Sequence, residues 1–229
     1  MKPKISVVMA VYCGGRYIEE QIKSILSQSY PVDELILIED SSPEPCVDVI
    51  SKAVGARISL ESDKTGSLSD GADGSDRTPT DCIQETVVRS GRCTVRYLEH
   101  VERKGYAQTF FDALKLATGD FIFFSDQDDI WEIDKVAVCI KVMRIYPEIT
   151  CLSAANILID SEGREIGRDK RLRERMISVS TEDLIMQKHG ALRPGMSTVI
   201  RRSLKEKIDG MDITDYEMHD RLIEYLAAI

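Results

Sequence analysis

Residues 4–12 read KISVVMAVY, a nearly unbroken apolar stretch that is rich in β-branched side chains. Such a run is typical of a strand buried on both faces of a parallel sheet. Residues 16–29 follow with isoleucine and leucine at helical spacing, and a second apolar run, ELILIE, occupies residues 34–39. A strand, a helix and a strand in this order predict a βαβ unit with parallel strands.

The same alternation continues along the chain. Apolar patterns predict strands at residues 94–99 and 120–125, with an amphipathic helix at 105–118 between them that Gly119 closes. We therefore expect an α/β fold with a mostly parallel sheet flanked by helices. The other predicted elements are helices from Trp131 to about residue 146, at 180–189 and at 216–228, and strands at 149–160 (with a short partner after residue 163) and 197–201.

Length and composition predict one globular domain over residues 1–229, because a chain of 229 residues has room for a full core. Residues 61–81 interrupt the pattern, since serine, aspartate, glycine and threonine dominate there. We interpret this stretch as a flexible surface insertion, with a functional lid as the alternative.

The charge and cysteine content narrow the class of protein. The net charge of -9 disfavours a nucleic-acid binder. Residues 164–175 hold six basic side chains, either a contact for phosphate or anionic lipid or a solvated face. Six cysteines without a C-x-x-C pair predict reduced thiols. No apolar run approaches the ~18 residues of a membrane span, so we expect a cytoplasmic protein whose membrane contact, if any, is peripheral.

Acidic residues follow two of the predicted strands. Asp126, Asp128 and Asp129 come directly after the strand at 120–125, at the edge where open α/β sheets bind ligands. Carboxylates this close repel one another unless a cation such as Mg²⁺ or Mn²⁺ neutralises them. The alternative is that they cap the helix expected near Trp131, which explains Asp129 but not Asp126. The pair at 39–40 is either turn chemistry or a hydrogen-bonding site for a base or ribose.

These segments resemble the family 2 glycosyltransferases, inverting enzymes with the GT-A fold. The family's order is kept by AVY at 10–12, EDSS at 39–42, KGYAQ at 104–108 and TGD at 118–120, followed by SDQDDIW at 125–131. The DQDDIW variant is most similar to the rhamnosyltransferase-like branch. The similarity covers residues 5–131 apart from the insertion, with a weaker tail at 195–202 and 218–222.

The resemblance implies transfer of a sugar from a nucleotide diphosphate donor, of dTDP or UDP type, to an acceptor hydroxyl. It implies a saccharide or lipid-linked saccharide acceptor in bacterial surface polysaccharide synthesis, and Mn²⁺ or Mg²⁺ as cofactor. It also implies the site residues: Val11, Tyr12, Glu39 and Asp40 around the base, Lys104 near the nucleotide, Asp126 at the ribose or metal, Asp128 as the stronger metal ligand and Asp220 as the base that deprotonates the acceptor.

Local sequence leaves some of these assignments open. Asp220 is equally well explained as a helix acid in a first turn, and we expect His219 to be an ordinary, partly exposed histidine. The family more often has asparagine at Cys13 and aspartate at Glu39, and asparagine is also common at Arg103 and Thr109. The chain ends at residue 229, so we expect a short or truncated acceptor lobe.

Three other functions fit parts of the pattern. A D-x-D phosphatase places its motif after the first strand rather than past the midpoint of the chain. A sugar nucleotidyltransferase needs a longer glycine-rich, basic loop than residues 13–16 provide. A nucleotide-sugar-binding fragment without turnover is the non-enzymatic alternative.

Overall fold

The computed structural model describes residues 2–58, 82–168, 195–211 and 219–227. The predicted insertion at 61–81, the predicted helix at 180–189 and most of the basic cluster at 164–175 lie outside these ranges. In the described part of the chain, no helix combines the length and apolarity that crossing a bilayer requires.

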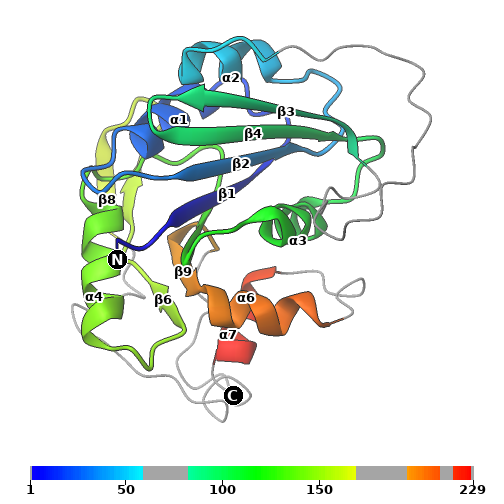
Figure 1. The fold of residues 1–229 in the computed structure, drawn as a ribbon. Helices are drawn as coiled ribbons and strands as arrows, with labels where there is room; N and C mark the ends of the chain where they lie inside the picture. Colours follow the sequence, from blue (N-terminus) through cyan, green and yellow to red (C-terminus); the bar gives the residue numbers. More distant parts are fainter. Residues whose placement is uncertain (1, 59–81, 169–194, 212–218, 228–229) are drawn as a thin grey trace.

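A seven-stranded, mostly parallel sheet forms the centre of the fold (Figure 1). Its strand order is β3-β4-β2-β1-β5-β9-β6, and the four middle strands β4, β2, β1 and β5 run parallel. Antiparallel strands flank this centre on both sides. The strands are β1 (Ile5–Val11), β2 (Glu34–Glu39), β3 (Cys82–Ser90), β4 (Cys93–His100), β5 (Phe121–Ser125), β6 (Cys151–Ser153) and β9 (Thr198–Arg201).

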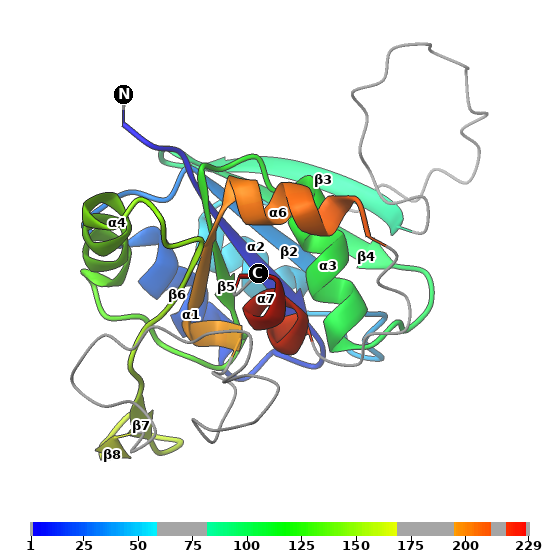
Figure 2. The same cartoon turned by 90° about the horizontal axis from the view of Figure 1, so that it is seen from below.

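Helices cover both faces of the sheet and create two separate cores. Strand β1 contributes to both, because Val7 and Met9 pack with one set of helices and Val8 packs with the other. Figures 1 and 2 show the resulting three layers. One face carries α1 (Ile18–Leu26), α2 (Val47–Val54) and α4 (Lys135–Ile145), and the other carries α3 (Tyr106–Leu116), α6 (Arg202–Asp209) and α7 (His219–Ala227).

The structure confirms the predicted α/β fold and the opening βαβ unit, but two predicted elements are wrong. The strand expected at 149–160 is two short strands in different sheets: β6 joins the main sheet, whereas β7 (Ile157–Ile159) pairs with β8 (Glu165–Arg168). This hairpin stands apart from the main sheet (Figure 2). Its apolar side chains are exposed, so the apolar sequence pattern at these positions did not indicate a buried strand.

The helix expected from Trp131 begins four residues later, at Lys135. The backbone N–H of Trp131 donates to Ser24 Oγ (3.0 Å), which ties this part of the chain to α1 instead of to a helical turn. Helices α2 and α6 and strand β3 were not predicted. A 3-10 turn at Gly195–Ser197 precedes β9.

Candidate functional site

The carboxyl ends of β1, β2 and β5 meet at one edge of the sheet. Val11 is in register with Glu39, and Met9 is in register with Ser125. The chain therefore leaves the three strands side by side, and Tyr12, Asp40 and Asp126 are the first residues beyond them. This is the edge at which open α/β sheets bind ligands.

Gln127 joins the acidic loop to the end of β1. Its side-chain amide accepts from the backbone N–H of Tyr12 and donates to the carbonyl oxygen of Tyr12, both at 2.9 Å. A Cβ on Gly14 would lie 2.5 Å from Gln127 Oε1, so only glycine leaves room for this pairing. Gln127 thus fixes the backbone between Asp126 and Asp128.

Helix α1 holds the other side of the acidic loop. The Gln21 amide, in the orientation that satisfies all its partners, donates to the carbonyl oxygen of Asp129 (2.7 Å) and accepts from Trp131 Nε1 (3.0 Å). Trp131 packs on Phe123, with ring centroids 5.6 Å apart. The alternative that Asp129 caps a helix is wrong, because α4 begins six residues after it.

The carboxylates of this loop differ in exposure. Asp126 is half-buried and Asp128 is exposed, whereas Asp129 Oδ2 is buried and has no hydrogen-bond partner among the residues described. Burial raises the pKa of Asp129 to about 6; Lys135 opposes this shift and the negative charge of Asp128 adds to it. Lys135 Nζ donates to the Met196 carbonyl (2.9 Å), and burial lowers its pKa to about 8.

This donor set fits a hard divalent cation that takes most of its oxygens from a bound diphosphate and water. In the described ranges, no group of three or more histidine, cysteine or acidic side chains is arranged to hold a metal by itself. Asp126 and Asp128 are carboxylates at an open edge, and the buried Asp129 Oδ2 beside them has no hydrogen-bond partner among the described residues.

Glu39 ties together the loops that follow β1 and β2. It is buried, accepts a short hydrogen bond from Ser42 Oγ and accepts from the Cys46 N–H at 3.1 Å. Ser42 Oγ in turn accepts from the Cys13 N–H at 2.9 Å. Burial raises the pKa of Glu39, and these hydrogen bonds oppose that shift. Cys13 and Ser41 both have positive φ (51° and 52°), a strained backbone found often at functional sites.

Asp40 is bound to the turn that precedes α3. Its two carboxylate oxygens accept from the backbone N–H groups of Lys104 and Gly105, each at 2.8 Å. The structure therefore brings Asp40 and Lys104 together through the backbone N–H of Lys104. Lys104 Nζ lies 3.3 Å from Asp112 Oδ2, alongside α3.

Arg103 adds a contact that sequence reasoning missed. Its guanidinium carbon lies 4.0 Å from the centre of the Tyr12 ring, a cation–π distance. Neither residue carries a sequence signal for this contact, since 91 positions separate them along the chain.

The predicted base lies on α7, with Asp220 as its second residue. The expectation of a partly exposed His219 is wrong, because this side chain is 4% exposed. It stacks on Phe110 (centroids 4.2 Å apart) and on Phe124 (5.6 Å). Burial lowers its pKa to about 4, and neither ring nitrogen has a partner in the part of the chain that is described.

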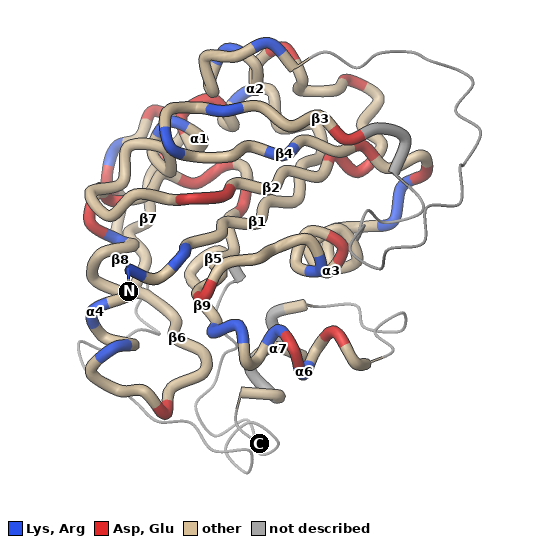
Figure 3. Tube along the Cα trace, viewed as in Figure 1, with Lys and Arg blue, Asp and Glu red and all other residues tan. Residues whose placement is uncertain are grey.

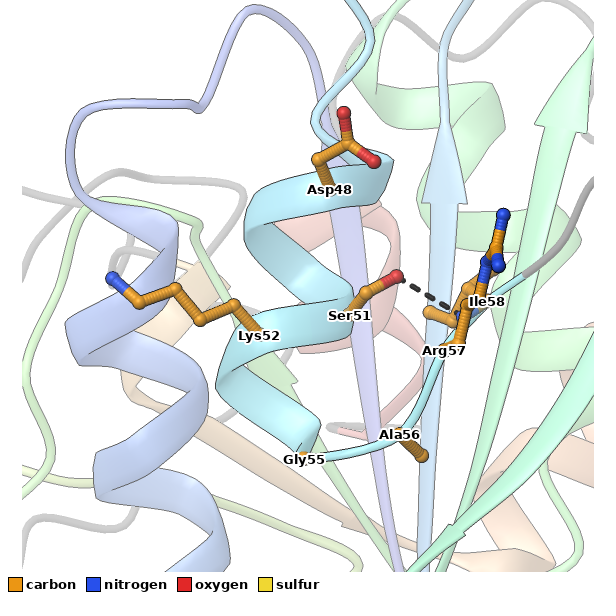
Figure 4. Close-up of a pocket in the computed structure, with 7 residues that line it drawn as sticks. All are labelled: Asp48, Ser51, Lys52, Gly55, Ala56, Arg57 and Ile58. Atoms are coloured by element: carbon orange, nitrogen blue, oxygen red, sulfur yellow. Dashed lines mark hydrogen bonds between the residues drawn. The ribbon is translucent and has the colours of Figure 1, made fainter.

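A hollow of about 530 Å³ lies elsewhere (Figure 4). It lies along helix α2, from its first turn at Asp48 to the residues that follow its end. None of the predicted site residues lines this hollow, and we assign it no role. It is lined by Asp48, Ser51, Lys52, Gly55, Ala56, Arg57 and Ile58.

Figure 3 shows charges of both signs interspersed along the described chain. The five cysteines whose side chains are described are free thiols, as the sequence predicted.

The chain is similar in sequence to known glycosyltransferases. The chain is 29% identical over 198 residues to the dTDP-rhamnosyl transferase RfbG of Shigella flexneri, covering 85% of this chain and 54% of RfbG. It is 26% identical over 158 residues to the glucosyltransferase WfaP of Escherichia coli, covering 69% of this chain and 47% of WfaP. The chain thus spans about half the length of these curated relatives.

A solved structure shares the fold. The mannosyltransferase PcManGT from Pyrobaculum calidifontis, in complex with GDP-Man and Mn²⁺, superimposes with a TM-score of 0.59 at 17% identity, covering 97% of this chain and 51% of that one. The sequence model of the protein family described as glycosyl transferase family 2 matches residues 6–66 and 72–209, which is most of the chain. The protein therefore belongs to the family 2 glycosyltransferases.

Proposed function

We propose that this domain binds a nucleotide diphosphate-sugar at the carboxyl edge of β1, β2 and β5 and transfers the sugar to an acceptor hydroxyl with inversion. The observation that carries the proposal is the pairing of Gln127 with the Tyr12 backbone. It joins the end of β1 to the loop of Asp126 and Asp128, so one ligand can contact both. The family match supports the same reaction.

In this proposal, Val11 and Tyr12 border the base, and Asp126 and Asp128 hold Mn²⁺ or Mg²⁺. The bound ion would stabilise the negative charge that develops on the leaving diphosphate. Glu39 and Asp40 hold the loops around the base, since their carboxylates bind the backbone N–H groups of Cys46, Lys104 and Gly105.

Asp220 is the proposed catalytic base. A hydroxyl is a poor nucleophile until a carboxylate takes its proton during attack. The acceptor oxygen would then form the new bond to the anomeric carbon while the bond to the diphosphate breaks, which inverts that carbon in one displacement. The neighbouring His219 is neutral near pH 7, because its lowered pKa of about 4 leaves it uncharged.

The relatives narrow the donor and acceptor. RfbG is named for dTDP-rhamnose transfer, WfaP for UDP-Glc and a diphosphoundecaprenol acceptor, and PcManGT was solved with GDP-Man and Mn²⁺. We propose a dTDP- or UDP-sugar donor and a saccharide or lipid-linked saccharide acceptor in bacterial surface polysaccharide synthesis. The reaction would then take place in the cytoplasm, with peripheral contact at the inner face of the membrane.

The test is calorimetric titration of UDP, dTDP and GDP, each with and without Mn²⁺, into the parent chain and into Asp128→Asn. We expect one diphosphate to bind in a Mn²⁺-dependent way and the Asp128→Asn variant to lose this binding. The matched control is Asp134→Asn, since Asp134 is also exposed and makes no side-chain cap for α4. Equal binding by parent and Asp128→Asn would refute the assigned metal site.

Turnover distinguishes a transferase from a binding fragment. We expect the parent to consume the donor sugar when an acceptor is present, and Asp220→Asn to bind the nucleotide equally but to lose turnover. Binding without turnover on any acceptor would favour the non-catalytic alternative, and release of inorganic phosphate would favour a phosphatase.

A further inference from the structure

A buried histidine lies between two carboxylates next to the proposed nucleotide site. His100, the last residue of β4, has Nδ1 3.1 Å from Asp40 Oδ1 and Nε2 3.3 Å from Asp112 Oδ2. His100 is 1% exposed, and Asp40 and Asp112 are each 2% exposed. We call these three residues the Asp–His–Asp relay. It connects the end of β2 to the middle of α3.

Asp112 is surrounded by groups that stabilise its negative charge. An ionised carboxylate only accepts hydrogen bonds, and each ring nitrogen of His100 faces a carboxylate oxygen. Burial acts to raise the pKa of Asp112, but hydrogen bonds from His100 and Lys115 and the charges of Lys115 and Lys104 hold it well below its usual value. Buried charges persist when they are paired in this way.

The relay ends on the backbone rather than on a side chain. Asp40 accepts from the N–H groups of both Lys104 and Gly105. Gly105 has φ 84°, a conformation that favours glycine, and α3 begins at the next residue without a side-chain cap. One carboxylate therefore sets the direction in which the chain enters α3, and His100 and Asp112 set the orientation of that carboxylate.

We infer that His100 and Asp112 are positioning residues for the nucleotide site. They act through Asp40, by holding the turn at 104–105 where the proposed donor passes. The inference rests on the proposed function. It also implies that Lys104 shapes the site through its backbone N–H, because the ammonium group of Lys104 lies next to Asp112.

The experiment compares His100→Gln and Asp112→Asn with the parent chain by two measurements. Calorimetry gives the affinity for the nucleoside diphosphate that the parent binds, in the presence of Mn²⁺. Hydrogen exchange by NMR gives the protection of the Lys104 and Gly105 amides. We expect affinity to fall roughly tenfold, as for other residues that orient a ligand-binding group, and both amides to exchange faster.

The matched control is Asp160→Asn. Asp160 also holds a turn, accepting from the N–H groups of Glu162 and Arg164, but it lies in the β7–β8 hairpin. We expect it to leave nucleotide affinity and the exchange of the Gly105 amide unchanged. If His100→Gln does not fold, Asp112→Asn carries the test, because asparagine keeps the shape of the side chain.

The two proposals fail in different ways. A parent chain that binds no nucleotide overturns the proposed function, and the amide exchange still tests the relay. Folded variants that bind like the parent, or that keep the Gly105 amide as protected as in the parent, overturn the positioning role of His100 and Asp112.

Discussion

Acidification should destabilise this protein through His219. The folded-state pKa is lowered from 6.5 to about 4, because the ring is buried against Phe110 and Phe124. The unfolded chain therefore binds a proton that the folded chain does not take up between these two pH values. By linkage, the stability that neutral His219 contributes is present above pH 6.5 and is lost as the pH falls toward 4.

The magnitude follows from the difference between the two pKa values. At ~1.36 kcal/mol per pKa unit, the difference corresponds to ~3 kcal/mol, of which about 2 kcal/mol is lost between pH 7 and pH 4.5. The assay is urea denaturation at several pH values, comparing the parent with His219→Phe. Phenylalanine keeps a flat ring against Phe110 and Phe124 but does not titrate.

The difference between the two chains isolates His219, because all other groups titrate in both. We expect the free energy of unfolding of the parent to fall by about 2 kcal/mol more than that of His219→Phe over this range. Parallel pH profiles would show that His219 is hydrated or partnered in solution, and the argument from burial would then be wrong.

Three further predictions concern the loops at the two ends of β1 and β5. Asp129→Asn should stabilise the protein by up to ~3 kcal/mol in urea denaturation at pH 7.5. The raised pKa of Asp129 means that the stability of the parent falls as the pH rises from 3.8 to about 6. A parent chain that is equally stable at pH 3.8 and pH 6 would contradict this. Gly119→Ala should cost about 3 kcal/mol by the same assay, since its Cβ would lie 2.6 Å from the backbone nitrogen of Ser6, which cannot move aside. Gly14→Ala should cost only ~1 kcal/mol, because it displaces the flexible Gln127 amide, yet calorimetry should detect weaker nucleotide binding; unchanged affinity would separate Gln127 from the site.

The four parallel strands β4, β2, β1 and β5 in the middle of the sheet were predictable because their signal is local. Residues 5–11 and 35–38 are almost all apolar, and both strands are buried on both faces as expected. Helix α2 had a usable signal that was overlooked: Val47, Ile50 and Val54 fall at helical spacing. The hairpin of β7 and β8 misled the prediction because its apolar side chains do not enter either core.

The candidate site was predictable in part. That acidic residues lie at the carboxyl edge follows from the order of strands, and the structure brings Asp40 and Asp126 to that edge. Contacts between residues that lie far apart in the sequence were not predictable, because no periodicity of the sequence indicates them. Gln127 meets Tyr12 across 115 residues, and the burial of His219 depends on α3 and β5 together.

The hydrogen bonds at this edge divide its residues into two groups. Glu39, Asp40 and Gln127 use their polar atoms on the protein's own backbone, so their replacement should change the shape of the loops. Asp128 is exposed and Asp129 Oδ2 is without a partner in the described chain. A buried polar atom without a hydrogen bond is costly. A ligand therefore gains most binding free energy by contacting Asp128 and Asp129. In the proposed reaction, the aspartates at 126–129 therefore contact the donor, whereas Glu39 and Asp40 at the end of β2 shape the site that binds it.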